Sequence, residues 1–172
     1  LAQDGATVVI ADLSNAAQAA AAIGAGGTPT LGVETDVTSE PSVQAMVDEV
    51  ARKFGRIDIL VNNAGYGVIG AIEETSAAEV ERVFDTNVFG LLNVTRAVLP
   101  QMRTQRSGHV LNFSSIGGYA AATGFGIYSA TKFAVEAISE AMSMELEPLG
   151  VRTTVIEPGY FRTTFLSDNS VV

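Results

Sequence analysis

Tyr128 and Lys132, four residues apart, carry the strongest chemical signal in this chain of 172 residues. A spacing of four places both side chains on one face of a helix, one above the other. A phenol is a poor general base near neutral pH because its pKa is about 10, but a nearby cation favours the phenolate and lowers that pKa. The pair is therefore typical of a site that exchanges a proton. Alone, it fits equally well a half-buried tyrosine beside a solvated lysine.

Other short motifs stand where apolar strands are expected to end, which is where open α/β sheets bind their ligands. Ser115 follows one such strand, although Ser114-Ser115 by itself would fit a turn and cap. The run Asn62-Asn-Ala-Gly65 closes an earlier strand with small residues that let a ligand approach the backbone. The remaining strand-end motifs are Asp12, Asp36-Val37 and Glu157-Pro-Gly-Tyr-Phe-Arg-Thr163.

Short β-branched runs alternate with longer helical patterns along the chain. This alternation predicts βαβ units and a parallel sheet covered on both faces. The expected strands are Thr7–Ala11, Thr30–Glu34, Ile57–Val61, Gly108–Phe113 and Arg152–Ile156, and the expected helices are Asn15–Ile23, Pro41–Phe54, Ala77–Met102 and Tyr128–Leu149.

Helix ends and one irregularity are also predicted by residue type. Ser76 with Glu79 is typical of a capping box. Asn87 and Gly90 are poor helix formers inside the third helix, so we expect a kink or bulge there. Glycines that suit C-terminal caps are Gly24, Gly55 and Gly150.

Composition narrows the class of protein. With 47% hydrophobic and 17% charged residues, the chain can bury the core of a single domain. A net charge of -9 repels phosphate backbones and anionic lipid, which argues against nucleic-acid or membrane partners. The chain has no cysteine and one histidine, which excludes a thiolate or multi-histidine metal site and fits a cytoplasmic protein. We therefore expect no bound metal.

Taken together and in order, these motifs resemble the short-chain dehydrogenase/reductase family, classical type, over essentially the whole chain. The resemblance implies a Rossmann-like, doubly wound parallel sheet in a single NAD(P)-binding domain. It also implies an oxidoreductase that transfers a hydride between NAD(P) and a secondary alcohol or its ketone. The residues that carry it are Asp12, Asp36-Val37, Asn62-Asn-Ala-Gly65, Asn87, Ser115, Tyr128-x-x-x-Lys132 and Pro158-Gly-x-x-x-Thr163.

The resemblance implies four catalytic residues. Tyr128 would exchange a proton with the substrate oxygen, and Ser115 would donate a hydrogen bond to that oxygen. Lys132 would lower the pKa of Tyr128 and bind the nicotinamide ribose. Asn87 would hold a water that links Lys132 to solvent.

The resemblance also implies the residues that contact the cofactor. Asp12 would accept hydrogen bonds from the adenosine ribose and oppose a 2′-phosphate, so NAD is expected in preference to NADP. Asp12 could instead cap the following helix, a role for which Ser14 competes. The other implied contacts are Leu13, Asp36, Val37, Asn63, Ala64, Gly65, Tyr128, Lys132, Pro158, Gly159, Phe161 and Thr163.

One motif of the family is absent from the sequence, its Thr-Gly-x-x-x-Gly-x-Gly turn, which binds the pyrophosphate. We expect this turn and the first strand upstream of residue 1, and the last strand beyond residue 172, so that residues 1–172 form a partial domain. The first strand would lie between the strands that end at Asp12 and Asn62. We expect the chain alone to bind NAD weakly or not at all.

Alternatives remain for the function and the partners. A non-redox relative, such as a cofactor-free lyase or dehalogenase, also uses a Ser–Tyr pair. In that group, however, the resemblance gives the Tyr an Arg as its partner, whereas this chain has Lys132 at that position. A non-catalytic binding scaffold is a third possibility. The substrate class is open, from polyols to steroids, acyl thioesters and small ketones. The long helices that carry Asn87 and Tyr128 need a second covering surface, which favours a homodimer or homotetramer.

Overall fold

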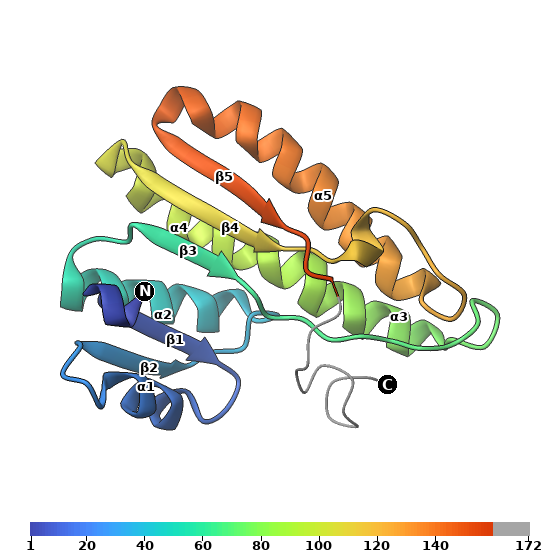
Figure 1. The fold of residues 1–172 in the computed structure, drawn as a ribbon, viewed down its shortest axis with the longest axis horizontal. Helices are drawn as coiled ribbons and strands as arrows, with labels where there is room; N and C mark the ends of the chain where they lie inside the picture. Colours follow the sequence, from blue (N-terminus) through green and yellow to red (C-terminus); the bar gives the residue numbers. More distant parts are fainter. Residues whose placement is uncertain (160–172) are drawn as a thin grey trace.

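Parallel strands and helices alternate in a Rossmann-like α/β fold, as the sequence predicts. The computed structural model describes residues 1–159. The strands are β1 (Val8–Asp12), β2 (Thr30–Glu34), β3 (Ile59–Asn62), β4 (Gly108–Phe113) and β5 (Val151–Ile156), and every pairing between them is parallel. All five lie within two residues of their predicted positions (Figure 1).

Within the described residues, the strands form two sheets and not one. β1 pairs with β2, and β3, β4 and β5 form a second sheet in that order. No pairing joins β1 to β3 in residues 1–159. The break lies at the position where the resemblance implies a strand between the ones that end at Asp12 and Asn62.

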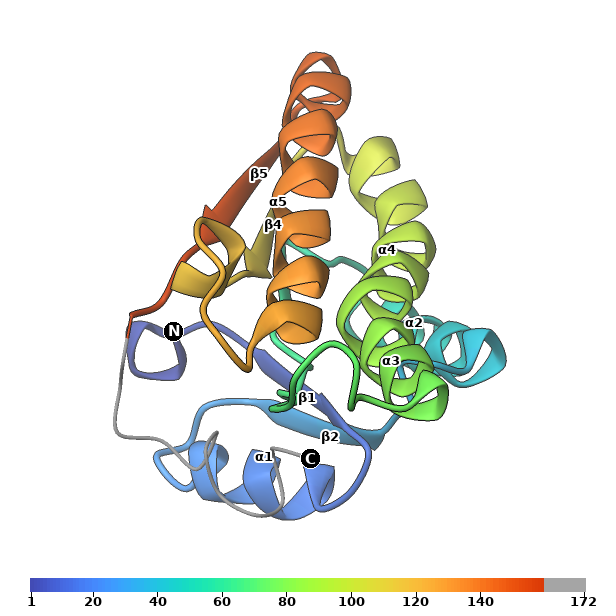
Figure 2. The ribbon, with the colours of Figure 1, turned by 90° about the vertical axis from the view of Figure 1, so that its right-hand side faces the viewer.

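Helices lie against both sheets. They are α1 (Ala16–Gly24), α2 (Glu40–Phe54), α3 (Ala77–Phe84), α4 (Leu91–Gln105) and α5 (Gly126–Leu146). Figure 2 shows α4 and α5 running alongside the three-stranded sheet, with α1 below β1 and β2. On that sheet Ile59 and Val61 of β3 are about two-fifths exposed, so this side of β3 is open to solvent. No helix in the described part of the chain could span a bilayer.

The hydrophobic core lies between the helices and the three-stranded sheet. Helices α2 and α4 contribute most of its buried residues, and β4 and β5 contribute one valine each. Burial of these aliphatic side chains is the main stabilising contribution to the fold. The most deeply buried members are Val43, Val98, Met102, Val110 and Val151.

The predicted helix ends are confirmed with one exception. Ser76 and Glu79 form the capping box, with reciprocal hydrogen bonds of 2.9 and 3.3 Å to backbone N–H groups. Gly55 and Gly150 are left-handed C-caps with φ of 73° and 79°. Gly24 is wrong as a cap because it is the last helical residue of α1. A Cβ there would lie 2.6 Å from Oγ1 of Thr30, so close packing on β2 explains this glycine.

The long helix expected over Ala77–Met102 is divided into three pieces. Between α3 and α4, residues Asp85–Gly90 form a π-helical turn that contains Asn87. This confirms the predicted irregularity. At Gly90 a Cβ would lie 2.7 Å from the side chain of Val37, so the turn lets the helix approach the segment after β2.

Gly32 of β2 provides a test of how tightly α1 packs. A Cβ at Gly32 would overlap the backbone carbonyl of Ala16 in α1, whereas one at Gly26 would meet nothing within 4 Å. Gly32→Ala should lower the free energy of unfolding by about 1–3 kcal/mol because the helix must move away from the strand. Urea denaturation measures this, with Gly26→Ala as the matched control, expected within about 0.5 kcal/mol of the parent. Equal stability of the two variants would contradict the packing described.

Candidate active site

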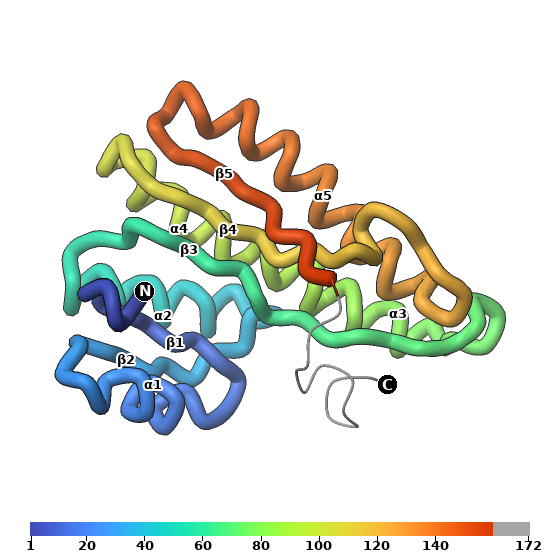
Figure 3. Tube along the Cα trace, viewed as in Figure 1, coloured from blue at the N-terminus to red at the C-terminus, as the bar shows by residue number. Residues whose placement is uncertain are grey.

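Three of the predicted catalytic residues, Ser115, Tyr128 and Lys132, come from the segment after β4 and the first turns of α5. Figure 3 shows the course of the chain from the end of β4 into α5. Ser115 follows β4 and starts the short helical turn η3 (Ile116–Gly118), where its Oγ accepts a hydrogen bond from the N–H of Gly117 at 3.1 Å. Tyr128 lies in the first turn of α5, and Lys132 lies one turn later. Both side chains are buried.

Tyr128 and Ser115 are in direct contact. A hydrogen bond from the Ser115 hydroxyl favours the phenolate and lowers the pKa of Tyr128, while burial raises it. Burial is the larger effect, so the pKa of Tyr128 is raised above its usual value. The expected lowering by Lys132 is therefore not the net effect in this structure.

Lys132 reaches across the end of β4. Its Nζ donates a hydrogen bond of 2.8 Å to the carbonyl of Phe113 and lies 5.8 Å from the centre of the Tyr128 ring. Burial lowers the pKa of Lys132 to about 8, and the carboxylate of Glu136 acts in the opposite direction. The Lys132 ammonium thus lies over the ring of Tyr128.

Asn87 ties the π-helical turn to two other elements. Its Nδ2 donates to the carbonyl of Tyr66 at 3.0 Å and to Oγ1 of Thr131 at 3.1 Å. Its Oδ1 accepts from the N–H of Tyr66 at 3.1 Å. The side chain is only 2% exposed and is engaged within the protein. The water-holding role expected for Asn87 remains a prediction.

Gly65 leaves open the surface above these residues. A Cβ at this position would lie 3.0 Å from Oδ1 of Asn87 and 3.7 Å from Nζ of Lys132. Any side chain would therefore fill the approach to the ammonium. An open backbone beside a buried cation fits the hydroxyl groups of a bound ribose, so this part of the site suits a nicotinamide cofactor.

Asp12 lies exposed at the end of β1, with Leu13, also exposed, beside it. Its Oδ1 accepts the backbone N–H of Ser14 at 3.0 Å. The N-cap of α1 is Asn15, whose side chain makes no capping hydrogen bond. Neither Asp12 nor Ser14 caps that helix. The Asp12 carboxylate therefore lies exposed at the carboxyl end of β1.

The other expected cofactor contacts differ in their surroundings. Asp36 accepts hydrogen bonds from the N–H and hydroxyl of Thr38, at 2.9 and 2.7 Å. Val37 packs at the start of α4, where its carbonyl accepts from Asn93 at 3.0 Å. Asn63, Ala64 and Gly65 are exposed after β3, as is Gly159 after β5. The carbonyl of Pro158 accepts a hydrogen bond of 3.1 Å from the N–H of Ile116 in η3. Phe161 and Thr163 lie outside the described residues.

A buried polar network beneath the site was not expected. Nδ2 of Asn62 donates to Oδ1 of Asn112 at 2.9 Å and to Oγ1 of Thr95 at 3.0 Å. Nδ2 of Asn112 donates to Oγ of Ser139 at 2.8 Å. The network joins β3 and β4 to α4 and α5. Two asparagines inside β-branched runs, where this residue is disfavoured, are the signal that could have revealed it.

Among the described residues, no group of three or more His, Asp or Glu side chains could hold a metal ion. The arrangement offers instead a hydroxyl pair, a buried cation and an open glycine surface. Such a site can exchange a proton with a substrate oxygen and orient a second bound molecule beside it.

Comparison with known proteins agrees with this geometry. A family model described as short chain dehydrogenase matches residues 1–170. The chain is 43% identical over 136 residues to 3-ketodihydrosphingosine reductase of Bacteroides thetaiotaomicron, covering 79% of this chain and 51% of that protein. It thus spans about half the length of that relative.

Solved structures show the same architecture. NAD+-bound xylitol dehydrogenase superposes with a TM-score of 0.90 at 34% identity, covering 92% of this chain and 62% of that one. A gluconate 5-dehydrogenase from Burkholderia cenocepacia, in complex with NADP and tartrate, has a TM-score of 0.92 at 30% identity, covering 97% and 66%.

The hydrogen bond between Asn62 and Asn112 can be tested by a double-mutant cycle. Each single change to Ala should lower the free energy of unfolding by about 1–3 kcal/mol, because each leaves a buried partner unsatisfied. The double variant should be more stable than the sum of the two losses implies, by about 0.5–1.5 kcal/mol. Urea denaturation of the four proteins measures the coupling. Additive losses would show that the two amides do not depend on each other.

Proposed function

This chain belongs to the short chain dehydrogenase family, and from that premise we propose that the protein is an oxidoreductase that transfers a hydride between NAD(P) and a secondary alcohol or its ketone. The observation that carries the proposal is the contact of the Ser115 hydroxyl with Tyr128 beside the buried Lys132 ammonium. When bound, the nicotinamide cofactor supplies the hydride donor or acceptor. The residues of the chain bind and orient the substrate and the cofactor, and they transfer the proton.

In this proposal Tyr128 is the acid/base. Its raised pKa keeps the hydroxyl protonated near neutral pH, which suits donation of the proton to a ketone oxygen. Ser115 donates to the same substrate oxygen and stabilises the charge that develops on it. The hydrogen bond between the two hydroxyls supports a common target for both.

Lys132 orients the cofactor in this proposal. An ammonium has three N–H donors, and the Phe113 carbonyl accepts one of them. The others would serve the ribose hydroxyls, above the surface that Gly65 leaves open. Asn87 would hold a water that links Lys132 to solvent. The π-helical turn that contains Asn87 supports a functional role, because such turns are frequent at functional sites.

The adenosine half of the cofactor would lie over the strand ends. Asp36, Val37, Asn63 and Ala64 would contact it, and Pro158, Gly159, Phe161 and Thr163 would lie near the nicotinamide. The exposed Asp12 carboxylate would accept the ribose hydroxyls and repel a 2′-phosphate, with Leu13 beside it. We therefore favour NAD over NADP for this protein, although the solved relatives carry either one.

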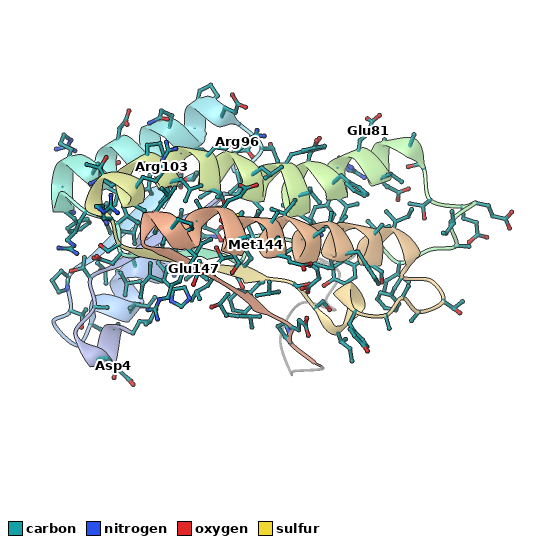
Figure 4. All side chains as sticks on the ribbon, turned by 90° about the horizontal axis from the view of Figure 1, so that it is seen from above. Asp4, Glu81, Arg96, Arg103, Met144 and Glu147 are labelled. Atoms are coloured by element: carbon teal, nitrogen blue, oxygen red, sulfur yellow. The ribbon has the colours of Figure 1, made fainter. Side chains whose placement is uncertain are left out.

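We also propose a cytoplasmic homodimer or homotetramer. Phe133 and Met144 are 46% and 67% exposed, and their spacing along α5 places them on the same side of that helix. Figure 4 shows α5 beside α4, with Met144 on the first helix and Arg96 and Arg103 along the second. A second copy of the chain would cover this surface.

Replacing Tyr128 by Phe tests the acid/base role. The change removes one hydroxyl and should reduce turnover by about 10²–10⁴-fold while nicotinamide binding is retained. Turnover is followed by the absorbance of reduced nicotinamide in the protein that carries this chain, with a panel of secondary alcohols and ketones. Tyr119→Phe is the matched control, because Tyr119 is 80% exposed, and it should retain parental activity.

Two outcomes would contradict the proposal. Activity of Tyr128→Phe within a few-fold of the parent would exclude Tyr128 as the acid/base. Substrate consumption with no change in nicotinamide absorbance would favour the non-redox relative.

The cofactor preference is tested by Asp12→Ser. Loss of the carboxylate removes the repulsion of a 2′-phosphate, so the ratio of Kd for NADP to Kd for NAD should fall by about tenfold or more, or ~1.4 kcal/mol. Fluorescence titration of the protein that carries this chain, with each nucleotide in turn, gives the ratio. Asp48→Ser on α2 removes an equal charge from an exposed position and should leave the ratio unchanged. An unchanged ratio in Asp12→Ser would overturn the assignment.

A further inference from the structure

Glu136 has a buried carboxylate oxygen that the proposed chemistry does not use. Its Oε1 is inaccessible to solvent and has no hydrogen-bond partner in the described part of the chain. A buried polar atom without a partner is costly, and burying an ionised carboxylate costs more. Such a group calls for an explanation, which its neighbours supply.

Glu136 follows Lys132 by four residues on α5, one turn further along the same side of the helix. Its carboxylate lies against η3, because a Cβ at Gly118 would come within 3.0 Å of Oε1 of Glu136. The same Cβ would contact Oγ of Ser114. Only a residue without a side chain at position 118 leaves room for the carboxylate.

Glu136 and Lys132 both have neighbours in the segment at the end of β4. Phe113 accepts the hydrogen bond from Nζ of Lys132, and Oγ of the next residue, Ser114, lies against the same Gly118 position as the Glu136 carboxylate. The side chains of Lys132 and Glu136 therefore both extend from α5 toward the segment that follows β4. Both side chains are partly or wholly withdrawn from water, so their interaction is weakly screened.

No other charged group offsets the burial of Lys132 within the described residues. On α5 its other titratable neighbour is Tyr128, which is neutral when protonated. The segment 113–118 has no charged side chain, and the π-helical turn presents Asn87. The loop after β3 presents the backbone of Gly65. Burial lowers the pKa of Lys132 to about 8, and the carboxylate of Glu136 raises it.

We propose that Glu136 is a positioning residue whose carboxylate holds the buried Lys132 side chain in its ammonium form. The inference deepens the proposed function, and only its consequence for turnover rests on that function. Without the carboxylate, Lys132 would lose its proton at a lower pH and could no longer donate hydrogen bonds from a charged group to a ribose.

The protonation state of Lys132 can be measured without any enzymatic assay. Lys53 and Lys132 are the two lysines of residues 1–172, so NMR of protein labelled with ¹³C-lysine can follow the side-chain titrations of both. Glu136→Gln keeps the size of the side chain and removes the charge. The midpoint of Lys132 should fall by about half a pH unit or more, while that of Lys53 stays constant.

Matched variants separate this effect from loss of charge in general. Glu140→Gln removes the same charge from an exposed position one turn further along α5 and should leave Lys132 unchanged. Glu136→Asp keeps the charge and should restore most of the parental midpoint, with far-UV circular dichroism to confirm that each variant is folded.

An unchanged Lys132 midpoint in Glu136→Gln, or an equal shift in Glu140→Gln, would overturn the inference. In a protein with turnover, the loss of activity at high pH should begin at lower pH in Glu136→Gln. If no turnover is found, the proposed function fails while the titration still decides the role of Glu136.

Discussion

The hydrogen bond from the Lys132 ammonium to the Phe113 carbonyl joins the helix and the strand on which the candidate active site depends. A buried cation must be satisfied by nearby acceptors, so α5 can occupy only a narrow range of positions relative to the end of β4. Tyr128, one turn earlier, is thereby brought against Ser115. Gly117 of η3 packs close to Tyr128, since a Cβ at Gly117 would lie 3.4 Å from the Tyr128 ring, in van der Waals contact.

Polar groups beneath the site maintain the same arrangement. The amides of Asn62 and Asn112 link the two central strands of the site to Thr95 of α4 and Ser139 of α5. Asn87 links the π-helical turn to α5 through Thr131. Directional hydrogen bonds of this kind fix the relative rotation of helices, which hydrophobic packing alone leaves less defined.

Much of this could be predicted from sequence, because the strands are short β-branched runs and the Tyr-x-x-x-Lys spacing defines a helix face. The rule that ligands bind at strand ends predicted the place of Ser115, whereas its meeting with Tyr128 was implied by the family resemblance. The pKa of Tyr128 could not be predicted, since its direction depends on how deeply the phenol is buried. Glu136 was also missed, because its sequence position is equally compatible with a solvated face, and only the space left by Gly118 shows otherwise.

The gap between β1 and β3 lies where the family resemblance implies a further strand. Within residues 1–159, the unit formed by β1, β2 and α1 is attached through side-chain packing of residues such as Val9 and Leu31. A strand paired with both β1 and β3 would add a continuous ladder of hydrogen bonds to this packing. Asp12 and Lys132, which stand on opposite sides of the gap, would then be held at a fixed separation by one sheet.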